Sequence, residues 1–297
     1  MAVLASGCTT VSPTETSTLT TPQTYTNITL SAPDGREIPT RVFMPTEDCS
    51  PCELIIFSHG NLATYDRYDV LLEDWAARGY VVASSQHVDS EEHPERERYQ
   101  NADVTGTRLE DYIAASEYFA EPGLNFEGLS FSENQFAAGH SYGGMIALIA
   151  GGAVASEGAL DFSDAGVEPS AIVAISPPGE LPGRIDNAGY ALVDKPLLVV
   201  TGTTDVLPGF IDEWDIHLDS FYANETNNAY ALVFENMNHY FNGAFGRITP
   251  EGAAAQPAID TLNTQISAFL GAISNGEPPS GSDWEQTNNP IVRVLTK

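Results

Sequence analysis

The sequence is poor in positive charge. It carries 12 Lys and Arg against 41 Asp and Glu over 297 residues, so its formal net charge is −29, and only Lys195 and Lys297 are lysines. Proteins that bind nucleic acids gain much of their affinity by neutralising phosphates with Lys and Arg. Anionic membrane surfaces attract the same side chains. We therefore expect no nucleic-acid partner and no electrostatic attachment to a membrane.

Long apolar runs are also missing. The sequence has no stretch of about 18 apolar residues, the length that crosses a bilayer as a helix. Hydrophobic residues nevertheless make up 42% of the chain, a value typical of globular proteins and too high for global disorder. The length fits one large α/β domain or two small ones.

Cysteine is scarce, and one of the three cysteines stands near the start of the chain. Residues 1–8 read Met-Ala-Val-Leu-Ala-Ser-Gly-Cys, and the small residues before Cys8 resemble the cleavage site of bacterial lipoproteins, in which this cysteine is lipidated. The basic start and most of the apolar stretch of such a signal are absent. Residues 1–23 are therefore interpreted as a signal remnant followed by a Ser/Thr/Pro-rich tether. The resemblance implies a bacterial cell-envelope or secreted location, with membrane attachment only through a lipid on Cys8.

The other two cysteines, Cys49 and Cys52, have C-x-x-C spacing. A redox site with this spacing would stand at the start of a helix, whereas these residues precede an apolar run typical of a strand. A zinc site would need two further ligands, and the sequence shows no second pair. A structural disulfide between Cys49 and Cys52 is the favoured interpretation for an exported protein, and no metal site is expected.

The body of the chain alternates short apolar runs with amphipathic segments. An Asp-Gly turn at residues 34–35 lies between two alternating segments and predicts a hairpin. Short apolar runs predict buried strands, and helical spacing predicts helices at residues 66–78, 104–120, 143–153, 209–222 and 256–271. The pattern predicts an α/β fold with an eight-stranded, mostly parallel sheet flanked by helices on both faces. The polar segment 86–102 is predicted to be a surface loop.

A candidate nucleophile follows the fifth predicted strand. Residues 139–143 read Gly-His-Ser-Tyr-Gly and match the pattern G-x-S-x-G. In this pattern the serine stands on a sharp turn from strand to helix, and the glycines allow the close backbone approach that exposes its hydroxyl. An apolar strand precedes Ser141 and an apolar helix follows it, as the motif requires, so Ser141 is predicted to be a nucleophile.

With this motif the sequence resembles the α/β-hydrolases. Within that superfamily it is most similar to the dienelactone hydrolase-like, platelet-activating-factor acetylhydrolase-like and bacterial cutinase-like (polyester hydrolase-like) serine esterases. The strand end at residues 58–60 and the Arg108-x-x-Asp111 pattern support this branch, and Arg108 and Asp111 could pair at one-turn spacing. The resemblance implies that residues 24–297 form a single α/β-hydrolase catalytic domain with an extended C-terminal tail.

The resemblance also implies a general base and an acid for the serine. α/β-Hydrolases carry their catalytic histidine in the loop after the eighth strand, where this chain has His239, and their acid just after the seventh strand, where it has Asp205. The chain order Ser141, Asp205, His239 is the order expected for this fold. Asp212 and Asp215 remain alternatives for the acid.

The other five histidines are given other interpretations. His140 belongs to the turn of the nucleophile and is expected to point away from the hydroxyl, and His59 adjoins the loop after the third strand. His87 and His93 are expected to be solvated in the loop 86–102. His217 lies in a helical stretch.

An ester hydrolase also needs two donors for the oxyanion of its tetrahedral intermediate. The resemblance places them at the backbone N–H groups of Tyr142 and Asn61, with Leu62 as an alternative to Asn61. Leu62, Leu207, Tyr240 and Phe241 are predicted to bind substrate.

The resulting hypothesis is a serine carboxylic-ester hydrolase that acts through an acyl-enzyme with a Ser-His-Asp triad and no cofactor. Its expected substrates are short- to medium-chain esters or polymeric, cutin- or polyester-like esters. The alternatives are a lipase, thioesterase or peptidase on the same fold, or a non-catalytic binding protein of the cell envelope.

Overall fold

A single mixed sheet organises the molecule. The computed structural model describes residues 25–47, 49–155, 168–277, 279 and 292–297. Within these residues nine strands form one sheet in the order β1-β2-β4-β3-β5-β6-β7-β8-β9. Their bounds are β1 Tyr25–Ser31, β2 Glu37–Phe43, β3 Cys52–Ser58, β4 Tyr80–Ser85, β5 Phe131–His140, β6 Ala171–Ile175, β7 Leu197–Gly202, β8 Ala229–Phe234 and β9 Val292–Thr296. Strands β3 to β8 run parallel, and the pairs β1–β2, β2–β4 and β8–β9 are antiparallel.

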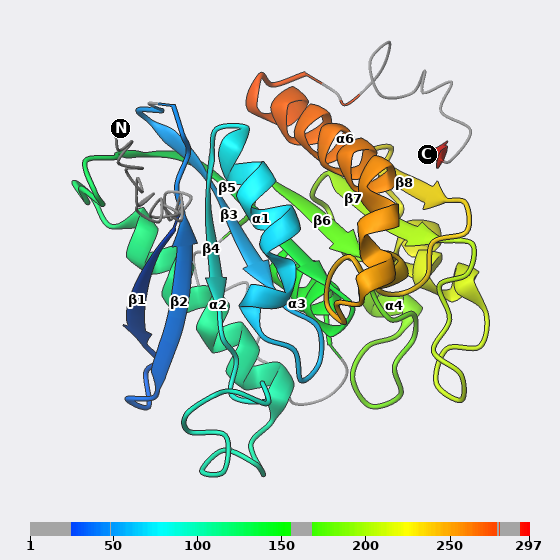
Figure 1. Ribbon diagram of the computed structural model, residues 1–297, viewed down its shortest axis with the longest axis horizontal. Helices are drawn as coiled ribbons and strands as arrows, with labels where there is room; N and C mark the ends of the chain where they lie inside the picture. Colours follow the sequence, from blue (N-terminus) through cyan, green and yellow to red (C-terminus); the bar gives the residue numbers. More distant parts are fainter. Residues whose placement is uncertain (1–24, 48, 156–167, 278, 280–291) are drawn as a thin grey trace, which may run out of the picture.

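Helices cover both faces of the sheet, as the sequence predicts (Figure 1). The α-helices are α1 Asp69–Ala77, α2 Val104–Ala120, α3 Tyr142–Ala150, α4 Asn187–Tyr190, α5 Asp219–Ala223 and α6 Gln256–Ser274. Short 3₁₀ helices are η1 Tyr65–Tyr68, η3 Trp214–Leu218, η4 Phe241–Gly243 and η5 Pro250–Ala255. Helices α1 and α6 pack on one face, and α2, α3 and α5 pack on the other.

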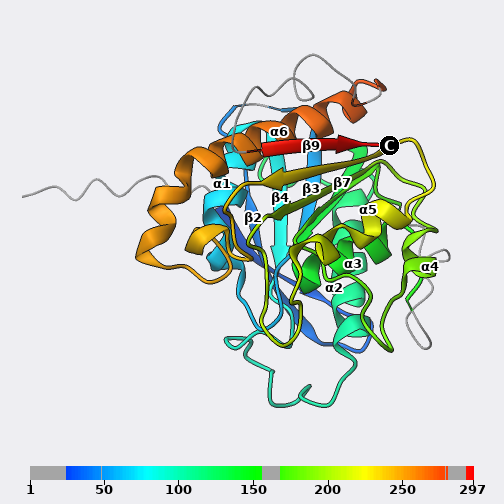
Figure 2. The same ribbon diagram turned by 90° about the vertical axis from the view of Figure 1, so that its right-hand side faces the viewer.

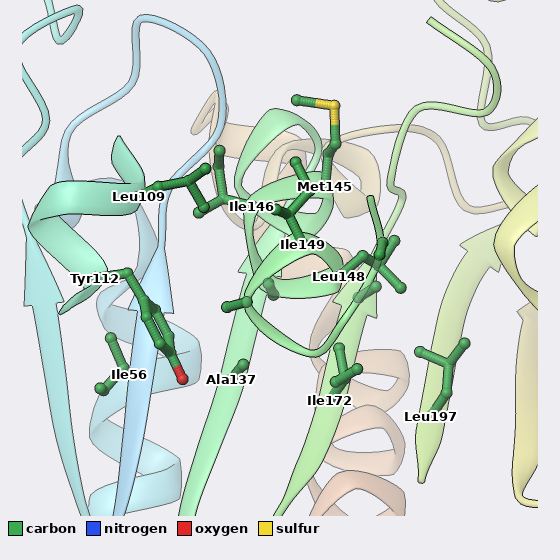
Figure 3. Close-up of a cluster of buried hydrophobic side chains, with 14 of the residues drawn as sticks. Ile56, Leu109, Tyr112, Ala137, Met145, Ile146, Leu148, Ile149, Ile172 and Leu197 are labelled. Carbon is green, nitrogen blue, oxygen red and sulfur yellow. The ribbon is translucent and has the colours of Figure 1, made fainter. Parts of the chain in front are cut away.

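Alternation along the strands divides the core between the two faces. In β3, Leu54 and Ile56 face the side of α2 and α3, whereas Ile55 and Phe57 face the side of α1 and α6. Figure 3 shows the first of these layers, where α3 lies over β5 and β6. Helix α3 has apolar residues on every side because it is buried between the sheet and its neighbours, which makes it a rigid support for the residue that precedes it.

The ninth strand differs from the eight that the sequence predicts. Strand β9 pairs antiparallel with β8, from Val292 opposite Phe234 to Thr296 opposite Tyr230, at the edge of the sheet beside α6 (Figure 2). Its five residues are too few to give a clear alternating signal, and most of the interaction that orders them comes from a strand some 60 positions earlier.

The ends of the chain bear on two other expectations. The expected lipid attachment at Cys8 and the expected tether of residues 1–23 concern residues outside the described ones, as do residues 280–291 of the expected tail. Cys49 and Cys52, the first residue of β3, are joined by a disulfide with sulfur atoms 2.02 Å apart. Among the described residues, we find no helix with the length and hydropathy needed to cross a membrane.

Candidate active site

Ser141 lies on a strained turn between β5 and α3. Its backbone has φ 55° and ψ −123°, a conformation that a residue with a side chain rarely adopts. The flanking glycines make the turn possible: a Cβ on Gly139 would lie 2.2 Å from the carbonyl oxygen of Gly143, and one on Gly143 would lie 1.9 Å from that of Ser58. The G-x-S-x-G pattern is therefore a steric requirement of this turn, which presents the serine side chain at the carboxyl edge of the sheet.

Three side chains from different segments form a hydrogen-bonded chain at this edge. Nε2 of His239 lies 2.9 Å from Oγ of Ser141, and Nδ1 of His239 lies 2.8 Å from Oδ1 of Asp205. Because the ionised carboxylate can only accept, Nδ1 carries the proton and Nε2 is left to accept from the serine. The structure thus brings together the three residues that the sequence placed in a triad.

The alternative acids lie elsewhere. Asp212 is exposed and accepts a hydrogen bond from the backbone N–H of Gly209 at 2.8 Å, and Asp215 is exposed on η3. Only Asp205 of the three candidates contacts His239. Its loop is fixed against the loop of His239 because the backbone N–H of Thr204 donates to the carbonyl of Met237 at 3.1 Å.

The carboxylate of Asp205 is buried and surrounded by donors. Its Oδ2 accepts from the hydroxyls of Ser176 at 2.6 Å and Thr201 at 2.9 Å. Burial by itself raises the pKa of Asp205, but the imidazoles of His217 and His239 outweigh it and hold the pKa far below its usual range. Asp205 is therefore a permanent anion behind His239.

A second imidazole contacts the same carboxylate oxygen, which the sequence did not reveal. Nε2 of His217 lies 2.9 Å from Oδ1 of Asp205, and the ring of His217 stacks on that of His239 with centroids 5.4 Å apart. Asp205, His217 and His239 include the donor types of a metal site. However, the nitrogens already lie at hydrogen-bond or ion-pair distance from Oδ1, so the carboxylate itself accounts for their grouping.

The loop after β3 supplies the second side of the site. The carboxylate of Asp89 accepts a hydrogen bond from the backbone N–H of Leu62 at 3.1 Å, and the hydroxyl of Tyr68 accepts one from the backbone N–H of Gly60 at 2.9 Å. Among the described residues, no hydrogen bond is found for the backbone N–H of Asn61 or for that of Tyr142, the first residue of α3. This arrangement favours Asn61 over Leu62 as the second oxyanion donor.

His140 connects this loop to the loop of His239. Its Nδ1 accepts from the hydroxyl of Tyr68 at 2.9 Å, and its Nε2 donates to the carbonyl of His239 at 2.7 Å. Burial, helped by the nearby His239, lowers the pKa of His140 to about 3, so the ring is neutral and keeps this tautomer. Both ring nitrogens of His140 are thus occupied by Tyr68 and by the carbonyl of His239, which are positioning contacts that the sequence did not suggest.

A second serine–histidine–aspartate chain lies next to the loop after β3, residues 59–64, which contains the proposed donor Asn61 and is called the oxyanion loop below. Oγ of Ser58 is 2.8 Å from Nε2 of His87, and Nδ1 of His87 is 2.7 Å from Oδ2 of Asp111. All three side chains are buried, and Asp111 also forms an ion pair with the buried Arg36. The expectation of a solvated His87 and a solvated His93 in a surface loop was wrong, because both side chains are buried. The start of segment 86–102 turns inward, where His87 meets this network.

Arg108 joins the buried network to the loop after β3. It makes two bonds to Asp89, of 2.8 and 2.7 Å, and donates to the carbonyl of Gly60 at 3.1 Å. The expected pair between Arg108 and Asp111 is therefore absent, because each has a partner from a more distant segment. Through Asp89, Arg108 also fixes the N–H of Leu62, so the network holds the oxyanion loop in place.

A cleft of about 750 Å³ opens over Ser141. Leu62, Leu207 and Tyr240 line it, as predicted for substrate-binding residues, and so does Phe210. The prediction for Phe241 was wrong: this ring is fully buried and packs against Phe234 and Phe245. The other lining residues are Gly60, Asn61, Ala63, Thr64, Arg67, Tyr68, Glu91, His140, Ser141, Tyr142, Pro178, Leu181, His239, Gly246 and Arg247.

Comparison with known proteins agrees with the fold. No family model and no curated protein sequence matches the chain. Among solved structures, Est1E from Butyrivibrio proteoclasticus has a TM-score of 0.53 and 14% identity over 81% of this chain and 99% of its own. A dienelactone hydrolase from Anabaena variabilis has a TM-score of 0.53 and 16% identity over 80% and 97%. An acylaminoacyl peptidase from Pyrococcus horikoshii has a TM-score of 0.63 and 14% identity over 89% of this chain but 44% of its own. The chain therefore has the α/β-hydrolase fold, which these esterases, hydrolases and peptidases share.

Proposed function

We propose that the protein is a serine carboxylic-ester hydrolase. The observation that carries the proposal is the chain from Ser141 through His239 to Asp205, which ends in a cleft beside two backbone N–H groups. A serine hydroxyl is a weak nucleophile unless a base removes its proton during attack. Here the base lies at 2.9 Å and is oriented by a buried anion, as nucleophilic catalysis requires.

The mechanism follows from this geometry. Nε2 of His239 takes the proton of Ser141 as Oγ attacks the ester carbonyl, and the N–H groups of Asn61 and Tyr142 stabilise the resulting oxyanion. The imidazolium, stabilised by Asp205, then protonates the leaving alcohol, and an acyl group remains on Ser141. Water, activated by the same imidazole, hydrolyses this acyl-enzyme and restores the serine. The sequence of steps uses no metal ion and no organic cofactor.

The lining of the cleft supports an ester with an apolar part. Leu62, Leu181, Leu207 and Phe210 contribute apolar surface on several sides of Ser141. Volume and lining suit a short- to medium-chain ester, and the exposed Phe210 at the edge of the cleft is compatible with a segment of a polymeric ester. Solved structures of similar fold include an acylaminoacyl peptidase, so peptidase activity is the alternative to be tested beside lipase and thioesterase activity.

Covalent labelling with a fluorophosphonate tests the nucleophile. We expect one adduct, on Ser141, and none in the Ser141→Ala variant. Ser58→Ala is a matched control, because Ser58 is also within reach of a histidine but does not line the cleft. Unchanged labelling of Ser141→Ala in a folded sample would contradict the assignment and favour a non-catalytic binding protein. Parallel assays with p-nitrophenyl esters of graded chain length, a polyester film, peptide amides and acyl-CoA then separate the activities.

We also propose that the protein is exported by a bacterium and tethered through Cys8. This proposal rests on the small residues before Cys8 and on the Ser/Thr/Pro-rich segment that follows it. The intact mass of protein purified from a native host would show a diacylglyceryl-modified Cys8 as the first residue. An unmodified Cys8 would contradict the tether but would leave the proposed hydrolase activity unaffected.

A further inference from the structure

His217 occupies an unusual position behind the proposed triad. It lies on η3, outside the cleft, with its side chain fully buried, and its Nε2 lies 2.9 Å from Oδ1 of Asp205, the oxygen that His239 also contacts. Its other nitrogen, Nδ1, lies 2.7 Å from the carbonyl oxygen of Pro177. The standard form of the proposed mechanism needs one histidine on the carboxylate, and it leaves this second one unexplained.

The contacts of His217 fix its protonation state. A carbonyl oxygen only accepts, so Nδ1 of His217 carries a proton. Nε2 lies 2.9 Å from an ionised carboxylate, and a bare lone pair at that distance would be repelled by it. Apart from this ion pair, Nε2 has no hydrogen-bond partner among the described residues. The ion pair with Asp205 therefore favours a proton on Nε2 as well, and so favours a buried imidazolium.

The charges around His217 agree with this state. Asp205 faces it from the end of β7, Asp219 follows from α5, and Asp215 stands on its own helix. Burial lowers the pKa of His217, but the carboxylate of Asp205 outweighs burial and raises it. On the far side of His239, His140 is neutral.

We propose that His217 is a positioning residue that shares Asp205 with His239 and extends activity to lower pH. This inference rests on the proposed hydrolase function. The cation of His217 compensates part of the negative charge of Asp205 and repels a second positive charge on His239. His239 therefore remains neutral at a lower pH than it would beside Asp205 alone, and a neutral His239 can act as a base. The ion pair also holds the carboxylate in the orientation that His239 requires.

The size of the effect follows from the distance between the rings. A unit charge about 5.4 Å away shifts a titration by about one to two pH units when the effective dielectric constant is between about 40 and 20. Removing the charge should therefore move the acidic limb of the pH profile of kcat/KM upward by about one unit. Substrate affinity should not change, because His217 does not line the cleft.

The kinetic test compares the full-length protein with its His217→Gln variant, which keeps a polar side chain but has no charge. With a neutral short-chain p-nitrophenyl ester between pH 5 and 9, we expect the acidic limb of His217→Gln to shift up by about one unit, with a drop of about 10-fold in kcat at pH 5.5 and an unchanged KM. The matched control is His93→Gln, a buried histidine outside the cleft, whose profile should superimpose on that of the wild type. Superimposable profiles of His217→Gln and wild type would overturn the proposal.

A second measurement does not depend on activity or on the folding of a variant. In ¹⁵N-histidine-labelled wild-type protein, the two ring nitrogens of His217 should both show imidazolium chemical shifts at pH 7. A neutral ring with one unprotonated nitrogen would overturn the proposal even if the kinetics shifted. If no ester is hydrolysed but the imidazolium is present, the proposed function fails while the charged His217 stands, so the two failures are distinguishable.

Discussion

Among the described residues, two serine–histidine–aspartate chains have nearly equal distances but different surroundings. In the cleft, Ser141, His239 and Asp205 are linked by contacts of 2.9 and 2.8 Å, and beneath the oxyanion loop Ser58, His87 and Asp111 are linked by contacts of 2.8 and 2.7 Å. The first serine stands at a strained turn that opens to a cleft, and the second ends β3 and is 3% exposed. The hydrogen-bond distances within such a chain therefore do not by themselves identify a nucleophile.

The surroundings of the two carboxylates sharpen the difference. Asp205 faces two imidazoles and two hydroxyls, whereas Asp111 faces one imidazole, that of His87, and the guanidinium of Arg36. Burial raises the pKa of Asp111 to about 6 despite Arg36, whereas the pKa of Asp205 is held far below its usual range. In the proposed mechanism, the anion of Asp205 stabilises the imidazolium that forms on His239, whereas the buried chain is expected to stabilise the loop after β3.

The largest expected effect on kcat distinguishes Ser141 from Ser58. Ser141→Ala should reduce kcat by about 10⁴-fold or more, because the nucleophile of the proposed mechanism is removed. Ser58→Ala removes the two buried hydrogen bonds of this hydroxyl, with His87 and Arg108, and should leave kcat/KM within about 10-fold of the wild type. Both are measured with the same p-nitrophenyl ester. Equal losses in the two variants, with circular dichroism showing both folded, would mean that the buried chain takes part in the chemistry.

Substitution of the two aspartates should affect different properties: activity for Asp205 and stability for Asp111. Asp205→Asn should lower kcat by about 10⁴-fold, because an amide that donates to His239 favours the wrong tautomer. Asp111→Asn leaves Arg36 with less charge compensation in the interior, so we expect a loss of about 3 kcal/mol in the free energy of unfolding. Urea unfolding and kcat are measured for both variants. A stable but inactive Asp111→Asn protein would contradict this division of roles.

The sequence predicted one of the two chains and not the other, for a physical reason. Ser141 has a local motif, and the resemblance to the α/β-hydrolases then implied Asp205 and His239, each of which follows a predicted strand. The carboxyl ends of parallel strands meet at one edge of a sheet, which explains why these positions come together. His87 and Asp111 meet Ser58 only through tertiary packing, with no local pattern to indicate it. The polar composition of segment 86–102 even favoured the opposite interpretation for His87.

The same reasoning explains the other differences. Arg108 and Asp111 have the spacing of a helical pair, but a long arginine can reach either its own helix or a neighbouring loop, and the fold supplies Asp89. Phe241 follows the triad histidine closely in sequence, yet its turn directs the ring into the core. Strand β9 depends on pairing with β8 rather than on its own five residues.

A smaller effect is expected where the buried network meets the cleft. Asp89→Asn keeps the shape of the side chain but weakens its hold on Arg108 and on the N–H of Leu62. We expect kcat to fall by about 10- to 100-fold with little change in KM, because the oxyanion donor of the neighbouring Asn61 is less well placed in the transition state. The matched control is Asp260→Asn, on the exposed side of α6, where the carboxylate accepts from Gln256. A larger change in KM than in kcat would indicate a role in substrate binding instead.

The smallest effect concerns the pH dependence of stability. Burial, followed by the nearby Arg108, lowers the pKa of His87 well below its ordinary value near 6.5. A histidine whose folded pKa is lowered binds fewer protons in the folded state than in the unfolded state, so its contribution is fully present above pH 6.5 and is lost as the pH falls below that value. His87→Gln should therefore unfold more easily than the wild type at pH 7.5, but its free energy of unfolding should fall less between pH 6.5 and 5. We expect the difference between the two slopes to be about 1 kcal/mol per pH unit. Urea unfolding at four pH values measures this difference. Equal slopes of the free energy of unfolding against pH would show that His87 is already protonated in the folded protein. That result would remove the contrast between a neutral histidine in the buried network and the cationic His217 behind the cleft.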